Sequence, residues 1–275
     1  MFRTMQPQDL PALKALWCET FGDSAEFAET ALCSFAGAGN VWVAEAENAP
    51  VGMVSAVPVE LDGRKGVYLY GLAVAPAFRK RGIARAMVEH LAQTLPQNGV
   101  EFMVLIPAEE SLFGYYEALG FQKAFARRTL QRPIKRDLWA VAEFDAATAK
   151  ALCGLRAQFC PHLVQLAPTQ MAVVLADLYR QGVTIVSNKG GYGLYFRKGE
   201  TLHFVELQAV SDAAATTLLS AAREKEVVVE DAVVSVGAVQ ELFQNEGTRA
   251  DYGMIRFLSQ PFDVSEGYMG LMLDV

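Results

Sequence analysis

Residues 70–85 read YGLAVAPAFRKRGIAR, and this segment decides the fold. An almost unbroken apolar run over residues 67–74 precedes a short basic turn, and from Gly82 onward apolar residues recur at helical spacing. The pattern predicts a strand, buried on both faces, that leads through the turn into a helix. Because the first turn of a helix offers unpaired N–H groups and the positive end of its dipole, we interpret this helix start as a pyrophosphate cradle.

Two other phosphate-binding patterns do not fit this segment. It has no G-x-x-x-x-G-K-[ST] run, so it is not a P-loop, and its turn has one glycine, so it is not a dinucleotide fingerprint. Gly82 would let the backbone approach a bulky phosphate, and Ala84 would keep the first turn small. The alternative interpretation is an ordinary charged surface turn before a helix.

The first half of the chain alternates strands and helices around this segment. Ser24 is a candidate N-cap, Pro96 a helix stop and Gly120 a helix end. The order predicts a mixed α/β layout. We expect strands over residues 2–5, 41–46, 51–61, 67–74 and 100–106, and helices over residues 8–21, 24–35, 82–95 and 112–119.

A basic cluster at residues 127–136 divides the chain. It contains Pro133 and little periodicity, so we expect a loop or linker there, near a domain boundary. We therefore expect two domains, residues 1–135 and 136–275. In the second, we expect helices over residues 145–159, 168–181 and 211–224, and strands over residues 183–187, 193–197, 202–210, 227–229, 233–236 and 254–258.

Composition narrows the class of protein. The net charge of -7 makes the chain a poor nucleic-acid binder, because neutralising phosphates needs a basic face. The sequence contains no run of about 18 apolar residues, so we expect no membrane span, and its start has no apolar segment typical of a signal peptide. Four scattered cysteines without a C-x-x-C pair favour a reducing, cytoplasmic location and argue against a metal site.

The decisive segment resembles motif A of the GNAT acetyltransferase superfamily, whose R-x-x-G-x-A pattern stands at Arg79 to Ala84. The strand end Leu72 to Pro76 is similar to the family's L-A-V-x-P pattern. Residues 113–121 resemble motif B, in which a Tyr precedes a Gly-Phe pair. The resemblance covers about residues 1–130. It implies the GNAT acyl-CoA N-acyltransferase fold, a central mixed α/β sheet flanked by helices.

The resemblance also implies acetyl-CoA as co-substrate and assigns roles to particular residues. Tyr116 would lie near the thioester sulfur and protonate the leaving thiolate, since a Tyr with a pKa near 10 is a donor at neutral pH. The alternative for Tyr116 is a core aromatic at helical spacing. The pantetheine arm and thioester carbonyl would contact the backbone of Leu72, Ala73 and Val74, and the pyrophosphate would lie on Arg79, Lys80, Arg81, Gly82, Ile83 and Ala84.

The sequence departs from the family at two positions. The strand before Leu72 often carries a Glu that serves as base, but residues 67–70 hold no carboxylate, which leaves the base unassigned. Motif B often begins with an Asn, where this chain has Glu109. Ser111 is a candidate substitute for that cofactor contact.

The C-terminal tail offers one candidate base. Residues 268–273 are mainly apolar, so we expect them to pack inward and bring the Asp274 side chain and the α-carboxylate of Val275 near the cleft. Either could accept a proton if burial raised its pKa. The alternative is a final strand that ends in solvent, with Glu60 or solvent as the base.

The second half resembles a GNAT domain in topology alone. Its strand 202–210 meets the next helix through Ser211 and Asp212, where a carboxylate would repel a pyrophosphate. We expect a degenerate GNAT-like domain that has no cofactor site and covers the first half. Of the remaining candidates, we expect His90 to be solvated, His203 to be half-buried, and Trp42 and Trp139 to be packing residues.

The leading hypothesis is an N-acetyltransferase in which a primary amine of a small molecule or peptide attacks acetyl-CoA directly. One alternative is a non-catalytic acyl-CoA-binding sensor or interaction module, which the missing strand carboxylate favours. Another is a transferase that uses a longer acyl-CoA. The sequence leaves the acceptor and the oligomeric state open, because acceptor pockets are built from variable loops.

Overall fold

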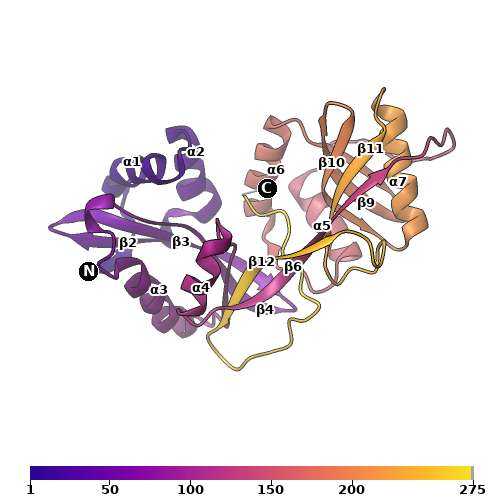
Figure 1. Cartoon of the computed structure of the whole chain (residues 1–275). Coiled ribbons are helices and arrows are strands. Elements are labelled where there is room, and N and C mark those ends of the chain that lie inside the picture. Colours follow the sequence, from indigo (N-terminus) through magenta and orange to yellow (C-terminus); the bar gives the residue numbers. More distant parts are fainter. Residues whose placement is uncertain (274–275) are drawn as a thin grey trace. The chain divides into compact units, whose positions relative to one another are not determined.

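The computed structural model describes residues 1–273, which form two compact units (Figure 1). Unit 1 consists of Met1–Lys123 and Gly253–Phe262. Unit 2 consists of Ala124–Tyr252 and the described residues from Asp263 onward. The C-terminal part of the chain therefore contributes a segment to the unit that contains the motif-bearing first half.

Unit 1 is built on a mixed sheet. Its strand order is β1-β2-β3-β4-β5-β12, and neighbours are antiparallel except for the parallel pair β4 and β5. β12 begins in unit 2 and ends in unit 1. The strands are β1 Phe2–Thr4, β2 Val41–Ala46, β3 Ala49–Leu61, β4 Arg64–Val74, β5 Phe102–Leu105 and β12 Thr248–Phe257.

Helices cover both faces of this sheet, α1 and α2 on one side and α3 and α4 on the other (Figure 1). Successive side chains of β4 point to opposite faces of the sheet, so both faces carry apolar groups that a helix can cover. Val67 and Leu69 join the core under α3, while Tyr70 contacts Trp17 of α1. The helices are α1 Leu10–Phe21, α2 Ala25–Glu29, its π-helical continuation Thr30–Ala36, α3 Ile83–Thr94 and α4 Phe113–Glu117. Short 3-10 turns lie at Pro7–Asp9, Ala38–Asn40, Pro76–Phe78, Leu95–Asn98 and Glu110–Leu112.

The main strands of unit 2 form a mixed array, ordered β6-β11-β10-β9-β8, in which only β10 and β11 are parallel. Its strands are β6 Gln122–Pro133, β8 Thr184–Asn188, β9 Gly191–Lys198, β10 Thr201–Ala209 and β11 Asp231–Gly237, with a two-residue strand β7 Gln165–Leu166. Its helices are α5 Ala149–Phe159, α6 Pro168–Arg180 and α7 Asp212–Lys225.

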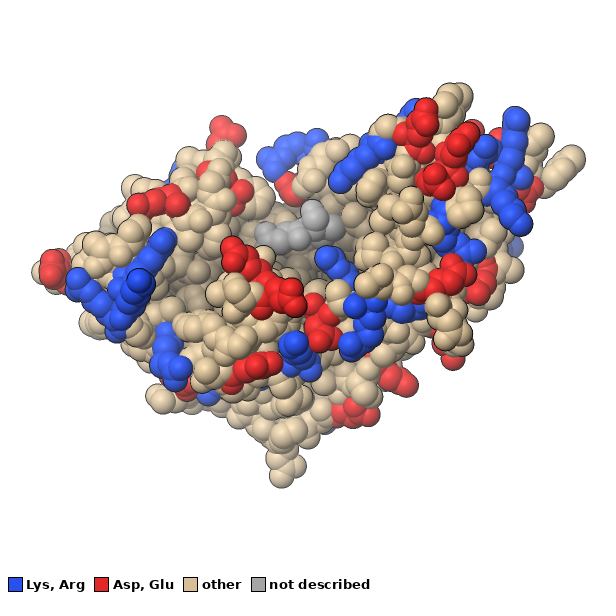
Figure 2. Space-filling view, viewed as in Figure 1, with Lys and Arg blue, Asp and Glu red and all other residues tan. Residues whose placement is uncertain are grey.

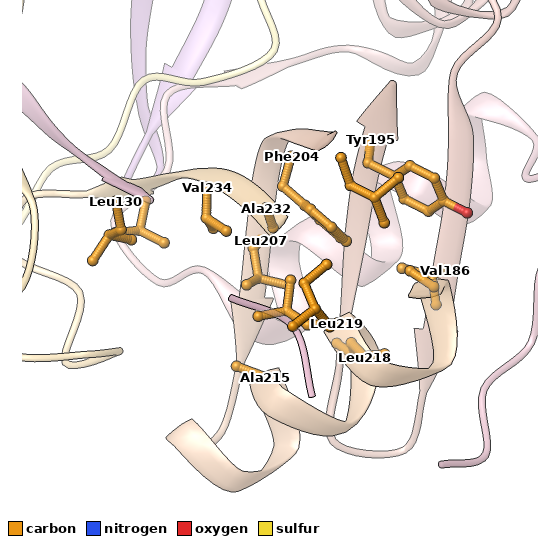
Figure 3. Close-up of a cluster of buried hydrophobic side chains, with 14 of the residues drawn as sticks. Leu130, Val186, Tyr195, Phe204, Leu207, Ala215, Leu218, Leu219, Ala232 and Val234 are labelled. Atoms are coloured by element: carbon orange, nitrogen blue, oxygen red, sulfur yellow. The ribbon is translucent and has the colours of Figure 1, made fainter. Parts of the chain in front are cut away.

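The core of unit 2 lies between α7 and its sheet. Leu218 and Leu219 of α7 pack with Phe204 and Leu207 of β10 and with Tyr195 of β9 (Figure 3). All five side chains are buried. The buried residues of α7 follow helical spacing and those of β11 alternate along the strand, whereas a bulge between Phe204 and Glu206 shifts the alternation along β10.

The prediction of a loop at residues 127–136 was wrong, because most of this cluster belongs to strand β6. Ala126, Arg128 and Leu130 are buried and alternate with exposed neighbours, as in a half-buried strand. A buried arginine at a core position conceals this alternation in the sequence. The Arg128 guanidinium donates to the carbonyl oxygens of Gln240, Leu242, Phe243 and Glu246 at 2.7–3.0 Å.

Three smaller predictions were also wrong. Residues 227–229 form no strand, because Val228 adopts a φ of 64°, outside the extended region. Trp139 is not a packing residue but is 89% exposed in the segment between β6 and α5. His90 is not simply solvated, because its ring lies 5.2 Å from that of Phe2 and 5.3 Å from that of Trp42 on the neighbouring strands β1 and β2.

Candidate functional site

Strands β4 and β5 separate partway along their length. They pair only from Gly66 to Tyr68, although β4 continues to Val74. The register of β4 with β3 shifts just after Tyr70, where Gly71 has a φ of 63°. The edge of β4 that faces β5 therefore has no paired strand from residue 69 onward, within the described chain.

Only glycine fits at position 71. A Cβ there would lie 2.4 Å from the Trp17 ring, and the left-handed backbone would strain any other residue. The irregularity shifts the register of the ladder, and beyond it Ala73 and Val74 pair again with Met53 and Gly52 of β3. The backbone of residues 72–74 is the part of the strand predicted to meet a pantetheine arm.

The start of α3 is open to an anion. Gly82 is its N-cap residue, with a φ of 78°, and no side chain among residues 1–273 caps the helix. The first N–H groups of α3 at Ile83 and Ala84 are thus available. A Cβ at Gly82 would have no atom within 4 Å, so the space in front of the helix is clear. This geometry fits a pyrophosphate group.

The basic turn before α3 is held by its own side chains. Arg79 donates from Nε to the Val74 carbonyl oxygen at 2.9 Å, which ties the turn to the end of β4. The Arg81 guanidinium lies 5.1 Å from the centre of the Phe78 ring. Lys80 adopts a φ of 60°. All three basic residues are exposed, so their charges face solvent beside the free N–H groups.

Tyr116 lies on α4, which follows β5 as α3 follows β4. The carboxyl ends of two parallel strands lie at the same edge of a sheet, so this places α4 beside the cradle helix. The Tyr116 ring packs 5.8 Å from Phe121 and 5.2 Å from Tyr115. Burial, with a smaller contribution from Tyr115, raises the pKa of Tyr116 to about 12. The phenol is therefore protonated at neutral pH and can donate.

The remaining residues considered for cofactor contact or for the base are Ser111, Glu60 and the residues of β4. Ser111 donates its hydroxyl to the Glu109 carboxylate at 3.1 Å, and both residues are exposed in the turn before α4. In place of the family's frequent carboxylate, β4 carries Tyr68 and Tyr70, whose rings stack at 5.6 Å. Glu60 is exposed at the far end of β3.

The apolar tail is buried in unit 2 over residues 268–273. Arg156 donates to the Gly270 carbonyl oxygen at 2.7 Å, and the Tyr252 hydroxyl binds both backbone groups of Met269. Arg156 also pairs with the buried carboxylate of Glu206 at 3.0 Å. The expected inward packing is observed for these residues. Asp274 and the candidate base Val275 lie outside the described residues.

The corresponding helix start in unit 2 is already occupied by its own groups. Ser211 accepts a hydrogen bond from the Ala214 amide at 3.2 Å, as an N-cap. Asp212 accepts one from the Phe243 amide at 2.7 Å. A carboxylate thus stands where unit 1 has an open, basic turn.

Three further observations concern metal clusters, helix length and surface charge. No cluster of three or more His, Cys, Asp or Glu residues with metal-binding geometry occurs within residues 1–273. None of the helices in that range is long and apolar enough to span a membrane. Basic and acidic side chains are interspersed on the face drawn in Figure 2.

Sequence reasoning missed two features of unit 1. The bulge at Gly71 has a signal, because a glycine inside an apolar strand often marks an irregularity. The ion pair between Arg256 of β12 and Glu89 of α3 has no signal in the sequence, since 167 residues separate the partners. Only the pairing of β12 with β5 brings them together.

Comparisons with known proteins agree with this description. Residues 10–121 match the sequence profile of the acetyltransferase (GNAT) family. Over 89 residues the chain is 37% identical to N-acetyltransferase family 8 member 2 of Rattus norvegicus, a match that covers 31% of this chain and 39% of that protein. The chain thus spans well under half the length of this relative.

Two solved structures share the fold. A GCN5-related N-acetyltransferase from Anabaena variabilis has a TM-score of 0.74 at 16% identity, over 94% of this chain and 73% of that one. A tandem GNAT protein from the clavulanic acid biosynthesis pathway has a TM-score of 0.52 at 14% identity, over 96% and 100%. The predicted mixed α/β fold is thereby confirmed.

Proposed function

Because residues 10–121 match the profile of the acetyltransferase (GNAT) family, we propose that the chain transfers an acetyl group from acetyl-CoA to a primary amine of a small molecule or peptide. The observation that carries this proposal is the strand-turn-helix of β4 and α3. One continuous segment joins an unpaired strand edge to an uncapped, basic helix start. An elongated ligand with amides at one end and phosphates at the other matches both parts.

In this proposal, unit 1 binds and orients the co-substrate. The thioester supplies an activated acyl group that an amine can attack directly. The backbone of Leu72, Ala73 and Val74 would pair with the pantetheine arm, and the α3 start would hold the pyrophosphate. Tyr116 would donate its phenolic proton to the leaving sulfur. Holding both substrates in place would supply much of the barrier reduction.

A protonated amine must lose a proton before it attacks, and β4 carries no carboxylate for that purpose. We keep the tail residues Asp274 and Val275 as the proposed source of the base. Deleting Val275, or extending the chain with a Gly-Ser tag, should then lower kcat without weakening acetyl-CoA binding. Wild-type turnover by both variants would exclude the terminal carboxylate.

A second candidate function is a non-catalytic acyl-CoA sensor, which the tyrosines at the usual position of the base favour. It keeps the same cradle but has no turnover. A CoA-release assay with a mixed panel of primary amines separates the two. Release above the rate without amine supports the enzyme, and tight acetyl-CoA binding without release for any amine supports the sensor.

The binding site itself can be tested by calorimetry with acetyl-CoA. Gly82→Asp adds bulk and negative charge at the cradle and should abolish binding. The matched control is Gly99→Asp, which lies beyond the other end of α3, with a φ of 77° and equally clear space. Both variants carry the same backbone strain, so unchanged affinity in Gly82→Asp, or equal loss in both, would contradict the site. The expected stoichiometry is one acetyl-CoA per chain.

A further inference from the structure

Arg256 connects the C-terminal strand of unit 1 to the cradle helix. Its Nη1 and Nη2 donate to the two carboxylate oxygens of Glu89 at 2.9 and 3.0 Å. Glu89 lies on α3, seven residues after Gly82. Two parallel bonds fix the orientation of the partners as well as their distance. The Arg256 guanidinium also holds the pKa of Glu89 below its usual range, with a smaller contribution from Arg85.

The same side chain lies near the turn that follows α4, on the side that a side chain at Gly120 would face. A Cβ at Gly120 would lie 3.4 Å from Nε of Arg256 and 3.6 Å from its Cδ. Gly120 has a φ of 79° and donates its amide to the Glu117 carbonyl, while the Phe121 amide donates to the Tyr116 carbonyl. The guanidinium therefore pairs with the cradle helix and lies near the turn after the helix that carries Tyr116.

Arg256 stands on a rigid base. The register of β12 with β5 pairs Met254 with Leu105 and Arg256 with Met103. Met254 and Ile255 are fully buried. The Arg256 side chain is 19% exposed and that of Glu89 is 41% exposed. An ordinary surface ion pair joins two exposed side chains, but here the arginine stands on a paired strand and its side chain is largely covered.

We propose that Arg256 is a positioning residue, which sets the spacing between the anion cradle on α3 and Tyr116 on α4. This inference rests on the proposed acyl transfer. An acyl-CoA held at its pyrophosphate must present its sulfur to Tyr116, so the two helices have to stay at one separation. A misplacement of about 1 Å can cost about 100-fold in rate. The catalytic spacing of the N-terminal half would thus depend on a residue near the C-terminus.

The test compares Arg256→Met and Glu89→Gln with the wild type in the full-length chain. Two ligands are used, acetyl-CoA and ADP, because ADP occupies the cradle alone. We expect the variants to bind ADP with unchanged Kd and to lose about 10- to 100-fold in kcat/KM for acetyl-CoA. Arg256→Lys, which keeps the charge, should recover part of the loss.

The matched control is Arg132→Met in unit 2, since Arg132 also makes two bonds to one carboxylate, that of Glu246, at 3.1 Å each. It should leave kcat/KM unchanged. The inference is overturned if Arg256→Met and Glu89→Gln both retain wild-type kcat/KM, or if ADP affinity falls as much as kcat/KM does. If Arg256→Met does not fold, Glu89→Gln on the helix surface decides alone. A wild-type chain that binds no acetyl-CoA refutes the proposed function, and this inference with it.

Discussion

At the scale of single residues, Tyr116 combines two interpretations that the sequence left as alternatives. Its ring is a packed aromatic, in contact with Phe121 and Tyr115. The same burial raises the pKa of its phenol to about 12, which keeps the proton on the oxygen at neutral pH. A phenol with its ordinary pKa near 10 is already protonated at neutral pH, so core packing does not create the donor but makes its proton harder to release.

Tyr116→Phe keeps the ring and removes the proton. If the proposed role holds, kcat should fall by about 10²–10⁴, while the Kd for acetyl-CoA stays within twofold. Steady-state kinetics with an accepted amine measures the first, and calorimetry the second. Tyr115→Phe, the neighbouring and more exposed phenol, is the control. A kcat within a factor of two of the wild type in Tyr116→Phe would make Tyr116 a packing residue only.

Glu89 gives a residue-level prediction about pH. Its pKa is lowered in the folded state, so the ion pair with Arg256 stabilises the protein above the ordinary carboxyl pKa, about 4.5. That contribution is lost as the pH falls through the lowered folded-state value. The difference in unfolding free energy between wild type and Glu89→Gln should therefore shrink from pH 7 toward pH 3. Urea titrations at several pH values measure it, and a constant difference would contradict the assignment.

At the scale of elements, β6 shows why a strand that contains several charged residues is difficult to predict from the sequence. Its buried face carries Ala126, Arg128 and Leu130, and a buried arginine is read from sequence as a surface residue. The four carbonyl groups that satisfy its guanidinium come from residues 240–246, more than 110 positions later. No local pattern contains that information.

Arg128→Met should destabilise unit 2. It removes four hydrogen bonds, and the bonds to Leu242 and Phe243 are buried, so those two carbonyl groups lose their partner without access to water. Each such group costs about 1–3 kcal/mol, and we expect a loss of about 2–6 kcal/mol in unfolding free energy. Urea unfolding measures it. Gln131→Met, on the exposed face of the same strand, should change stability by less than about 0.5 kcal/mol.

At the scale of the whole molecule, the cradle helix α3 in unit 1 has an open start, whereas the corresponding helix α7 in unit 2 is capped by its own side chain. If acyl-CoA binds at a single site, amide hydrogen exchange should become slower in one unit only. At a ligand concentration of 100 times Kd, binding stabilises the folded state by about 2.7 kcal/mol, or about 100-fold in exchange protection. We expect slower exchange around residues 72–86 and no change around residues 211–216. Equal protection in both regions would indicate a second site.

The sequence by itself determined the local chemistry of the site. Residues 70–85 encode a buried strand, a basic turn and a glycine-started helix, because each of these depends on neighbours a few positions apart. The structure confirms that strand and helix, with the helix starting at Ile83. The capping roles of Ser24 and Ser211 were predictable for the same reason. The roles of the individual site residues remain predictions.

Tertiary structure decided what depends on distant pairs. Strand pairing across more than 100 residues accounts for three of these features. It places the end of β12 in unit 1, brings Arg256 to Glu89 and buries Arg128. Trp139 is exposed and His90 is packed for the same reason, since their surroundings come from elements elsewhere in the chain. Periodicity reports which face of an element is apolar, but it does not report which other element covers that face.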